Sequence, residues 1–325
     1  MPEIYKGKGL SKRKVHEILG KIRRVETDDD LDGVFAAAQI KMHFPSVAVR
    51  ISGEKSVPSD ERTLVLDKAT SGTGWLIDHH PDSLEGTKAK VMYFSEGGQV
   101  PTSRLVYIAI GKGRLADIFL SATAEISDGL NWTGSKSGSL RLLQEKMPEY
   151  SKTSGSSNQF LTDQEIYTMT DVLSLIAEKN PKYALELGMS FYGALPRNMD
   201  QLSNILDSSS TELVGRYREF INSFSFTDFD NTKLFGRKVT LIDGTKIGEF
   251  QNSALEMTKR RRIGNYVMFR GPSVSIRTGD HQLFKSITAK LDDVSKGHGG
   301  RAGWYGITLK HEMEFEQFRQ LIREG

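Results

Sequence analysis

The chain has 325 residues, which at ~100–200 residues per domain predicts two domains with an ample core in each. Apolar residues make up 38% and charged residues 26%, as in folded rather than disordered proteins. The net charge is only +3, and cysteine is absent, which excludes disulfides, thiolate zinc sites and a cysteine nucleophile. Any metal site must therefore use Asp, Glu and His.

The sequence has no apolar run of the ~20 residues that a membrane helix needs, and its start lacks a secretory apolar segment. We therefore expect a cytoplasmic protein without a membrane partner. The charge is unevenly divided. Residues 225–325 carry 17 Lys and Arg against 12 Asp and Glu, whereas the preceding residues carry 27 against 29. This asymmetry suggests that the C-terminal part meets an anion, although such a balance also arises by chance.

In chain order, the first predicted element is a helix over 11–24, which Ser11 can cap. A short strand then leads into an acidic cluster, and an apolar helix follows Gly33. Three short apolar strands come next, over 47–51, 63–66 and 75–77. The last two lead directly into Asp67 and Asp78. Such strands with helices between them predict a parallel sheet, whose carboxyl-end polar residues gather in one crevice.

The rest of the chain continues the α/β pattern. Further helices are predicted over 103–110, 115–126, 139–146, 163–179 and 211–220, with a polar loop over 151–158 and a domain boundary near 205–235. Beyond the boundary we expect strands over 239–242, 266–269, 274–276 and 304–309, helices over 282–291 and 314–323, and a glycine-rich loop over 297–300.

Four aspartates lie within the five positions from Asp28 to Asp32. So much negative charge beside an apolar helix is unfavourable unless a cation binds or the carboxylates are fully solvated. A solvated, capped turn is one alternative. An EF-hand loop is another, because Asp28-x-Asp30-x-Asp32-Gly33 fits its first positions, but its last position is Gln39 rather than Glu.

His79 and His80 follow Asp78 at the end of a buried-type strand. An imidazole there is well placed to bind a metal, although a His pair is more often a surface or core feature. Asp67 ends another strand and Asp128 closes a helical stretch, so both can join the site. Taken singly, each aspartate is typical of a capping residue.

Together these residues form an ordered set: Asp28-x-Asp30-x-Asp32-Gly33, Asp67, Asp78-His79-His80 and Ser-Asp128-Gly. The set resembles the motifs of the DHH phosphoesterase family, which includes RecJ-type single-strand exonucleases, oligoribonucleases and family II inorganic pyrophosphatases. Lys296-Gly297-His298-Gly299-Gly300-Arg301-Ala302-Gly303 resembles the Gly-Gly-His-x-x-Ala-Ala-Gly loop of the family's associated domain, and Val274-Ser-Ile-Arg277 its Ser-x-Arg strand. The sequence departs from the pattern at Lys296 and Arg301, and it opens the first motif with Asp28, as RecJ-type members do, where many members have His.

The resemblance implies an α/β protein: a parallel-sheet DHH domain over 1–210, a linker over 211–230, and a smaller α/β substrate-binding domain over 231–325. The active site is expected in the cleft between the domains. Two divalent cations are implied, manganese more than magnesium, since oxygen and imidazole ligands suit both and His favours manganese. By the family pattern, Asp28, Asp30 and Asp67 would hold one ion, and Asp32, Asp67, His79 and Asp128 the other. Such a pair can activate a water for in-line attack on phosphorus.

His80, with Asp78, is the expected catalytic group: it would contact the scissile phosphate and stabilise the leaving oxygen, unless it merely packs behind His79. A phosphate is expected at Arg277, Gly297, His298, Gly299, Gly300 and Arg301, the alternative being a glycine-rich turn with surface arginines. The basic run 259–262 is either a nucleic-acid contact or a solvated face.

No basic groove studded with aromatic residues is evident in the sequence, which favours short substrates. The expected function is hydrolysis of short single-stranded RNA or DNA to nucleoside monophosphates. Alternatives are a 3′-phosphoadenosine 5′-phosphate phosphatase, a cyclic-dinucleotide phosphodiesterase, and a non-catalytic nucleic-acid-binding relative. The oligomeric state stays open, with a homodimer among the alternatives.

Overall fold

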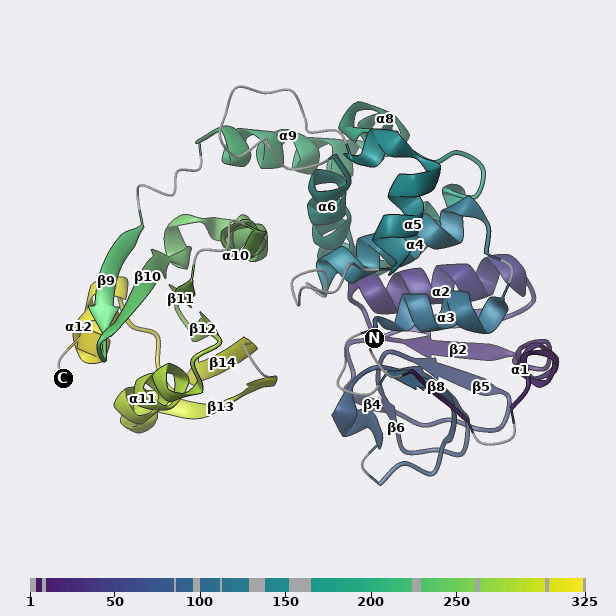
Figure 1. Cartoon of the computed structure of the whole chain (residues 1–325), viewed down its shortest axis with the longest axis horizontal. Coiled ribbons are helices and arrows are strands. Elements are labelled where there is room, and N and C mark those ends of the chain that lie inside the picture. Colours follow the sequence, from purple (N-terminus) through teal and green to yellow (C-terminus); the bar gives the residue numbers. More distant parts are fainter. Residues whose placement is uncertain are drawn as a thin grey trace. The chain divides into compact units, whose positions relative to one another are not determined.

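The computed structural model describes residues 4–7, 10–84, 86–95, 100–111, 113–128, 138–151, 165–223, 229–260, 264–301 and 304–323. The chain divides into two compact units, unit 1 (Met1–Arg216) and unit 2 (Tyr217–Gly325) (Figure 1). Their boundary falls inside helix α9 (Ser208–Ser223), so much of the expected linker is helical. Within the described ranges, no helix is both long and apolar enough to cross a membrane.

Unit 1 is built around a six-stranded sheet in the order β1-β8-β7-β5-β2-β3. Its strands are β1 (Ile4–Lys6), β2 (Arg24–Thr27), β3 (Ala48–Ile51), β5 (Thr63–Leu66), β7 (Trp75–Asp78) and β8 (Lys90–Ser95), with a small parallel pair of β4 (Ser56–Val57) and β6 (Ala69–Thr70). All neighbouring strands of the large sheet are parallel except β1, which pairs antiparallel with β8. The predicted α/β class with a parallel sheet is thus confirmed, with one antiparallel edge strand added.

The helices of unit 1 are α1 (Lys12–Leu19), α2 (Leu31–His43), α3 (Thr102–Ile110), α4 (Leu115–Ser127), α5 (Gly138–Lys146), α6 (Glu165–Lys179), α7 (Pro181–Ser190), α8 (Met199–Ile205) and most of α9. Ser11 accepts from the backbone N–H of Lys14 at the start of α1, as predicted, but the helix ends at Leu19 and not near Arg24. The sequence patterns missed α7, α8, β1 and β8. The predicted polar loop lies, apart from Ser151, outside the described residues.

The strand order places the acidic residues of the sequence together. From β2 the chain adds β3 on one side, and then returns to add β5 on the other side of β2. Such a reversal of strand order opens a crevice at the carboxyl ends of the two strands. Asp28 follows β2 and Asp67 follows β5, and these strands are direct neighbours, so both aspartates start from this crevice.

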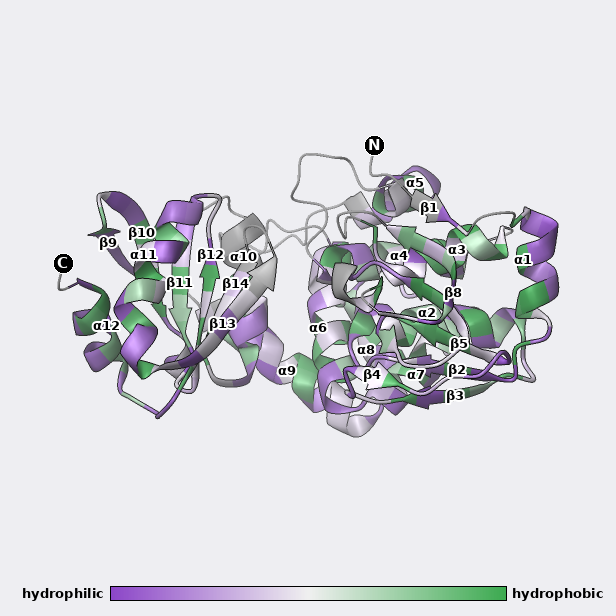
Figure 2. Cartoon of the chain, turned by 90° about the horizontal axis from the view of Figure 1, so that it is seen from below, coloured by the Kyte–Doolittle hydropathy of each residue, from purple (hydrophilic) through white to green (hydrophobic). Residues whose placement is uncertain are grey.

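Packing of α1, α2 and α3 on the sheet forms one hydrophobic core of unit 1. The buried apolar residues include Val15 and Leu19 of α1, Ile40 of α2 and Leu105 of α3. Helix α1 carries both hydrophilic and hydrophobic residues in Figure 2, and its buried residues are the apolar ones. Helix α2 has ten buried residues, as expected for a helix that is covered on more than one side.

Unit 2 contains a second six-stranded sheet in the order β13-β14-β12-β11-β10-β9. Its elements are β9 (Asp230–Leu234), β10 (Arg237–Asp243), α10 (Gln251–Arg260), β11 (Asn265–Phe269), β12 (Ser273–Arg277), α11 (His281–Leu291), β13 (Ser295–Arg301), β14 (Trp304–Leu309) and α12 (Phe315–Arg323). The pairing of β10 with β11 is parallel and the other pairings are antiparallel. One face packs on α11 and α12 through Val274, Ile287, Phe318 and their neighbours.

The glycine-rich segment 297–300 is a strand and not the predicted loop. It lies in β13, the edge strand, which pairs with β14 along most of its length. Glycine disfavours a strand only weakly, so the ladder with β14 overrides the local preference. Ala302 and Gly303, which end the motif, lie outside the described residues, as does the second half of the basic run, Arg261 and Arg262.

Candidate metal centre

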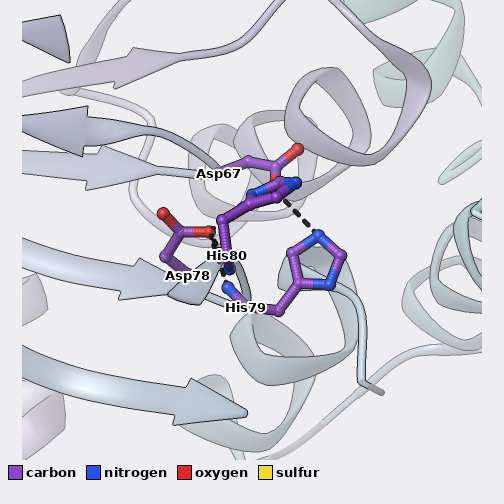
Figure 3. A group of neighbouring side chains, drawn as sticks. All are labelled: Asp67, Asp78, His79 and His80. Atoms are coloured by element: carbon purple, nitrogen blue, oxygen red, sulfur yellow. Dashed lines mark hydrogen bonds and ion pairs between the residues drawn. The ribbon is translucent and has the colours of Figure 1, made fainter. Parts of the chain in front are cut away.

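The candidate site lies at the carboxyl ends of β2, β5 and β7, three neighbouring strands of the parallel sheet. Asp67 directly follows β5, and its φ of +59° is in the left-handed region that few residues other than glycine adopt. Aspartate tolerates this conformation better than most residues, and strained backbone of this kind clusters at functional sites. The bend turns the Asp67 carboxylate toward the histidines at the end of β7 (Figure 3).

The side chain of Asp67 contacts three other side chains of the site. Its Oδ1 accepts from the Thr102 hydroxyl at 3.0 Å, and lies 3.3 Å from His79 Nε2 and 3.4 Å from His80 Nδ1. Its Oδ2 is buried and has no hydrogen-bond partner among the described residues. Burial, followed by repulsion from Asp30, Asp32 and Asp78, raises the pKa of Asp67 well above its ordinary value. The carboxylate is therefore costly to ionise without a cation.

Asp32 is held by the N-terminus of α3. Its two oxygens accept from the backbone N–H groups of Thr102 (2.7 Å) and Ser103 (2.8 Å), where a carboxylate is favoured by the unsatisfied helix donors. Burial and the charge of Asp128 nevertheless raise the pKa of Asp32 to about 6. The N–H groups of α3 thus orient this carboxylate without removing its need for positive charge.

His79 connects Asp32, Asp67 and Asp128. Its Nε2 lies 3.3 Å from Asp67 Oδ1, 3.5 Å from Asp128 Oδ2 and 3.8 Å from Asp32 Oδ2. Asp128 caps the C-terminus of α4, as the sequence predicted. Ligand atoms of Asp32, His79 and Asp128 lie within 4.8 Å of one another, and so do those of Asp67, Asp78, His79 and His80.

Asp78 and His80 form a close pair beside these groups (Figure 3). Asp78 Oδ1 accepts from the backbone N–H groups of His79 (2.6 Å) and His80 (3.0 Å), and lies 3.0 Å from His80 Nδ1. Burial raises the pKa of Asp78, but the hydrogen bonds and charge of His80 outweigh it and lower the pKa overall. Burial lowers the pKa of His80, but the Asp78 hydrogen bond and the charge of Asp67 raise it to about 9.

Asp28 and Asp30 lie at the start of α2 but, within the described residues, belong to neither of these ligand groups. Asp30 caps α2 by accepting from the backbone N–H of Gly33 at 2.9 Å. Its pKa is raised, first by desolvation of the carboxylate and then by repulsion from Asp32, although the residue keeps an exposed surface. Asp28 Oδ1 lies 3.4 Å from the Nζ of Lys68.

The donor set of the centre fits a divalent metal. It contains carboxylate oxygens and imidazole nitrogens, which suit Mn²⁺ or Mg²⁺. Within the part of the chain that the structure describes, the buried Asp67 Oδ2 and Asp78 Oδ2 have no hydrogen-bond partners, which is costly for carboxylate oxygens unless a cation neutralises them. The geometry therefore supports binding of a divalent cation.

In unit 2, the pairing register assigns the candidate phosphate-binding residues to two faces of the sheet. Directly opposite residues of antiparallel strands share a face. His298 lies opposite Ile307, which lies opposite Val274, on the face covered by α11. The His298 ring contacts Phe284 of α11, with ring centroids 5.8 Å apart.

Arg277 lies on the other face, with Ser275. Gly299 is opposite Gly306, and Gly306 is opposite Ser275, so these residues form one row across three strands. A Cβ built on Gly297, Gly299 or Gly306 would meet no described atom within 4 Å. Packing against the described residues thus does not require glycine here. Arg301 and Gly300 are in β13, but the structure describes no more than their backbone.

Comparison with known proteins identifies the fold. No protein-family model matches the sequence, and no curated protein matches it. Solved structures that match over nearly the whole chain include exonuclease RecJ bound to manganese (TM-score 0.54, 14% identity, 96% of this chain and 92% of that chain), the DHH domain of a member of a family of ribosomal proteins (0.58, 14%, 96% and 87%), and PggH, a pGpG-specific phosphodiesterase from Vibrio cholerae (0.52, 11%, 93% and 100%). The chain spans 53% of a longer RecJ from Thermus thermophilus.

The chain therefore has a DHH-family, RecJ-like fold. This is the fold of phosphoesterase hydrolases, among them the RecJ exonuclease and the pGpG-specific phosphodiesterase. The resemblance seen in the sequence motifs is confirmed at the level of the fold.

Three contacts of the centre were not predicted from the sequence. Thr102 and Ser103 bind two of the aspartates from the start of α3, and Lys68 lies beside Asp28. Ser and Thr at a helix start signal a cap, but the direction of these donors toward Asp32 depends on the packing of α3 against the sheet. Lys68 directly follows Asp67, and a lysine after a strand ordinarily indicates a solvated turn.

Thr102→Val is expected to weaken Mn²⁺ binding by about tenfold, because supporting hydrogen bonds to metal ligands typically contribute that much. The valine keeps the shape and the backbone N–H that binds Asp32, but removes the hydroxyl that donates to Asp67. Isothermal titration calorimetry of the metal-free protein with MnCl₂ measures the change. Thr102→Ser, which keeps the hydroxyl, is the control. Equal affinity of the valine variant and the wild type would contradict the role of this hydrogen bond.

In the metal-free protein, the imidazole of His80 is expected to titrate near pH 9, because Asp78 holds its protonated form. The pairing of protonated His80 with Asp78 stabilises the folded protein in full below the unfolded pKa of His, about 6.5. This stabilisation is lost as the pH rises through the folded pKa. Histidine NMR titration measures the midpoint, and Asp78→Asn should move it toward the ordinary value. A midpoint that is the same in both proteins would rule out this pairing.

Proposed function

We propose that the chain is a divalent-metal-dependent phosphodiesterase that hydrolyses short single-stranded RNA or DNA to nucleoside monophosphates. One observation carries the proposal: His79 and the carboxylates of Asp32, Asp67 and Asp128 meet at the carboxyl ends of the parallel strands, with oxygens that need a cation. We assign two ions, Mn²⁺ before Mg²⁺, to Asp28, Asp30, Asp32, Asp67, His79 and Asp128. Ions bound there would lower the pKa of a water and offset the charge of the phosphate.

His80 is the proposed proton donor of this reaction. Its side chain is 45% exposed, whereas that of His79 is 2% exposed, so of the two His80 has the open surface toward a substrate. Asp78 Oδ1 lies 3.0 Å from the Nδ1 of this imidazole and raises its pKa. When a water attacks the phosphorus and the P–O bond to the leaving group breaks, His80 can give its proton to the departing oxygen.

The proposed role of unit 2 is to hold a phosphate of the substrate. Arg277 offers a planar pair of N–H donors for phosphate oxygens, and the glycines opposite and beside Ser275 leave the backbone open to a ligand. His298, on the helix-covered face, would act separately from Arg277. The excess of basic residues in the C-terminal part supports an anionic substrate.

Short substrates are favoured over long strands. PggH, whose whole length this chain matches, is specific for pGpG, a linear dinucleotide. A cyclic-dinucleotide phosphodiesterase or a 3′-phosphoadenosine 5′-phosphate phosphatase would use the same carboxylate centre and stays an alternative. A non-catalytic role is disfavoured, because competent ligand types occupy the expected metal positions.

The test offers Mn²⁺-loaded protein labelled RNA and DNA of two to twenty-four nucleotides, together with pGpG, a cyclic dinucleotide and 3′-phosphoadenosine 5′-phosphate. We expect monophosphate release to be fastest from the shortest strands and to stop in EDTA. His79→Ala and Asp78→Ala should remove it. Preference for the longest strands would refute the proposed substrate class, and a wild-type rate in either variant would refute catalysis at this centre.

A further inference from the structure

Lys68 is a buried cation beside the carboxylates, and the proposed reaction gives it no role. Its side chain is 2% exposed. Its Nζ donates to the carbonyl oxygen of Ser52, and lies 3.3 Å from Ser52 Oγ and 3.4 Å from Asp28 Oδ1. Lysine is almost never fully buried unless it is paired, so these neighbours hold the ammonium in place.

Lys68 and Asp67 are adjacent in sequence but contact different parts of the centre. Asp67 meets His79 and the Thr102 hydroxyl, whereas Lys68 meets Asp28. The left-handed backbone conformation of Asp67 lies where the two side chains turn in different directions. One bend after β5 therefore places the Asp67 carboxylate beside His79 and the Lys68 ammonium beside Asp28.

The two sides differ in how available their ligands are. On the His79 side, Asp32 and Asp128 lie close enough to share an ion with the imidazole. On the other side, Asp28 already has the Lys68 ammonium, and Asp30 Oδ1 accepts from the start of α2. A cation that binds there must compete with the ammonium for Asp28 and is repelled by it.

We propose that Lys68 is a positioning residue that acts as a built-in counterion of Asp28, and that it makes the Asp28–Asp30 position the weaker of two metal positions. The inference rests on the proposed function only in taking the centre to bind divalent cations. One ion binds tightly beside His79, and the second binds at higher metal concentration. Lys68 thereby sets how much metal is needed to fill both positions.

Calorimetric titration of the metal-free full chain with MnCl₂, without substrate, tests this assignment. The wild type is expected to bind in two steps of separate affinity. Lys68→Gln keeps a donor for Ser52 and removes the charge, and should strengthen the weaker step by about tenfold or more. Lys68→Arg keeps the charge and should retain the wild-type pattern. Unchanged affinities in Lys68→Gln would overturn the proposal.

Asp28→Asn tests the same idea without altering Lys68. It should leave the tighter step unchanged and abolish the weaker one, whereas Asp32→Asn should weaken the tighter step. Loss of the tighter step in Asp28→Asn would overturn the proposal even if Lys68→Gln failed to fold. Because the measurement is metal binding, a chain that binds as expected but hydrolyses nothing would refute the proposed function alone. Hydrolysis with unaltered binding in Lys68→Gln would refute this inference alone.

Discussion

Asp67→Asn is expected to reduce kcat for oligonucleotide hydrolysis by at least about a thousandfold, since a metal centre supplies several kcal/mol of transition-state stabilisation. The Oδ1 of Asp67 lies within 3.5 Å of a ring nitrogen of both His79 and His80. Asparagine has the same shape and also tolerates the left-handed φ of this position. The loss would therefore reflect the missing charge, and it should appear in Mn²⁺ titrations as well as in rates.

The same substitution should stabilise the metal-free protein by about 1–3 kcal/mol at high pH, because it removes a buried carboxylate that repels its neighbours once it is ionised. The pKa of Asp67 is raised in the folded state, first by burial. Its penalty is therefore largest at high pH, starts to fall as the pH drops through the folded pKa, and is gone below the unfolded pKa of Asp, about 3.9. Denaturant unfolding in EDTA should show that the free energies of unfolding of the wild type and Asp67→Asn converge as the pH is lowered.

Asp60→Asn is the matched control for this variant. Asp60 is exposed, in the turn before β5, and its pKa is lowered by hydrogen bonds from Thr63 and Arg62. Its substitution should lower stability slightly and leave Mn²⁺ binding unchanged. If Asp67→Asn kept its metal affinity and its rate, Asp67 would not be a ligand of the centre.

Arg277→Ala is expected to raise KM by about 10- to 100-fold, because a hydrogen bond to a charged group contributes about 1.5–3 kcal/mol. Metal affinity should not change, because Arg277 is in unit 2 and the carboxylates are in unit 1. Steady-state kinetics on a dinucleotide, with Mn²⁺ calorimetry in parallel, separates the two effects.

Arg277→Lys and Arg237→Ala complete this comparison. Lysine keeps the charge but not the planar pair of donors, so it should recover only part of the affinity. Arg237 is in the same sheet but pairs with Asp280, so its removal should leave KM near the wild-type value. A fall in Mn²⁺ affinity for Arg277→Ala would contradict its assignment to the substrate.

Local pattern was enough to predict most elements that position the centre. Strands β5 and β7 were predicted with nearly correct ends, because each passes abruptly from apolar residues into an aspartate. The start of α2 was predicted from the opposite change, from aspartates to apolar residues. The strands β1 and β8 were missed. Strand β1 is short and pairs with β8, which is far from it in sequence, so neither gives a strong local signal.

The sequence by itself determined the residue types of the centre: with cysteine absent, a metal site has to use Asp, Glu and His, and Asp and His are the types that follow the buried strands. Tertiary structure alone decided which of them meet. The placement of β5 between β2 and β7 brings Asp67 to Asp32 and His79, and the packing of α3 supplies Thr102. In unit 2, pairing register separated His298 from Arg277, because a shift of one residue in a strand reverses the face of every side chain. Contacts between residues far apart in sequence decide such matters, and no local pattern encodes them.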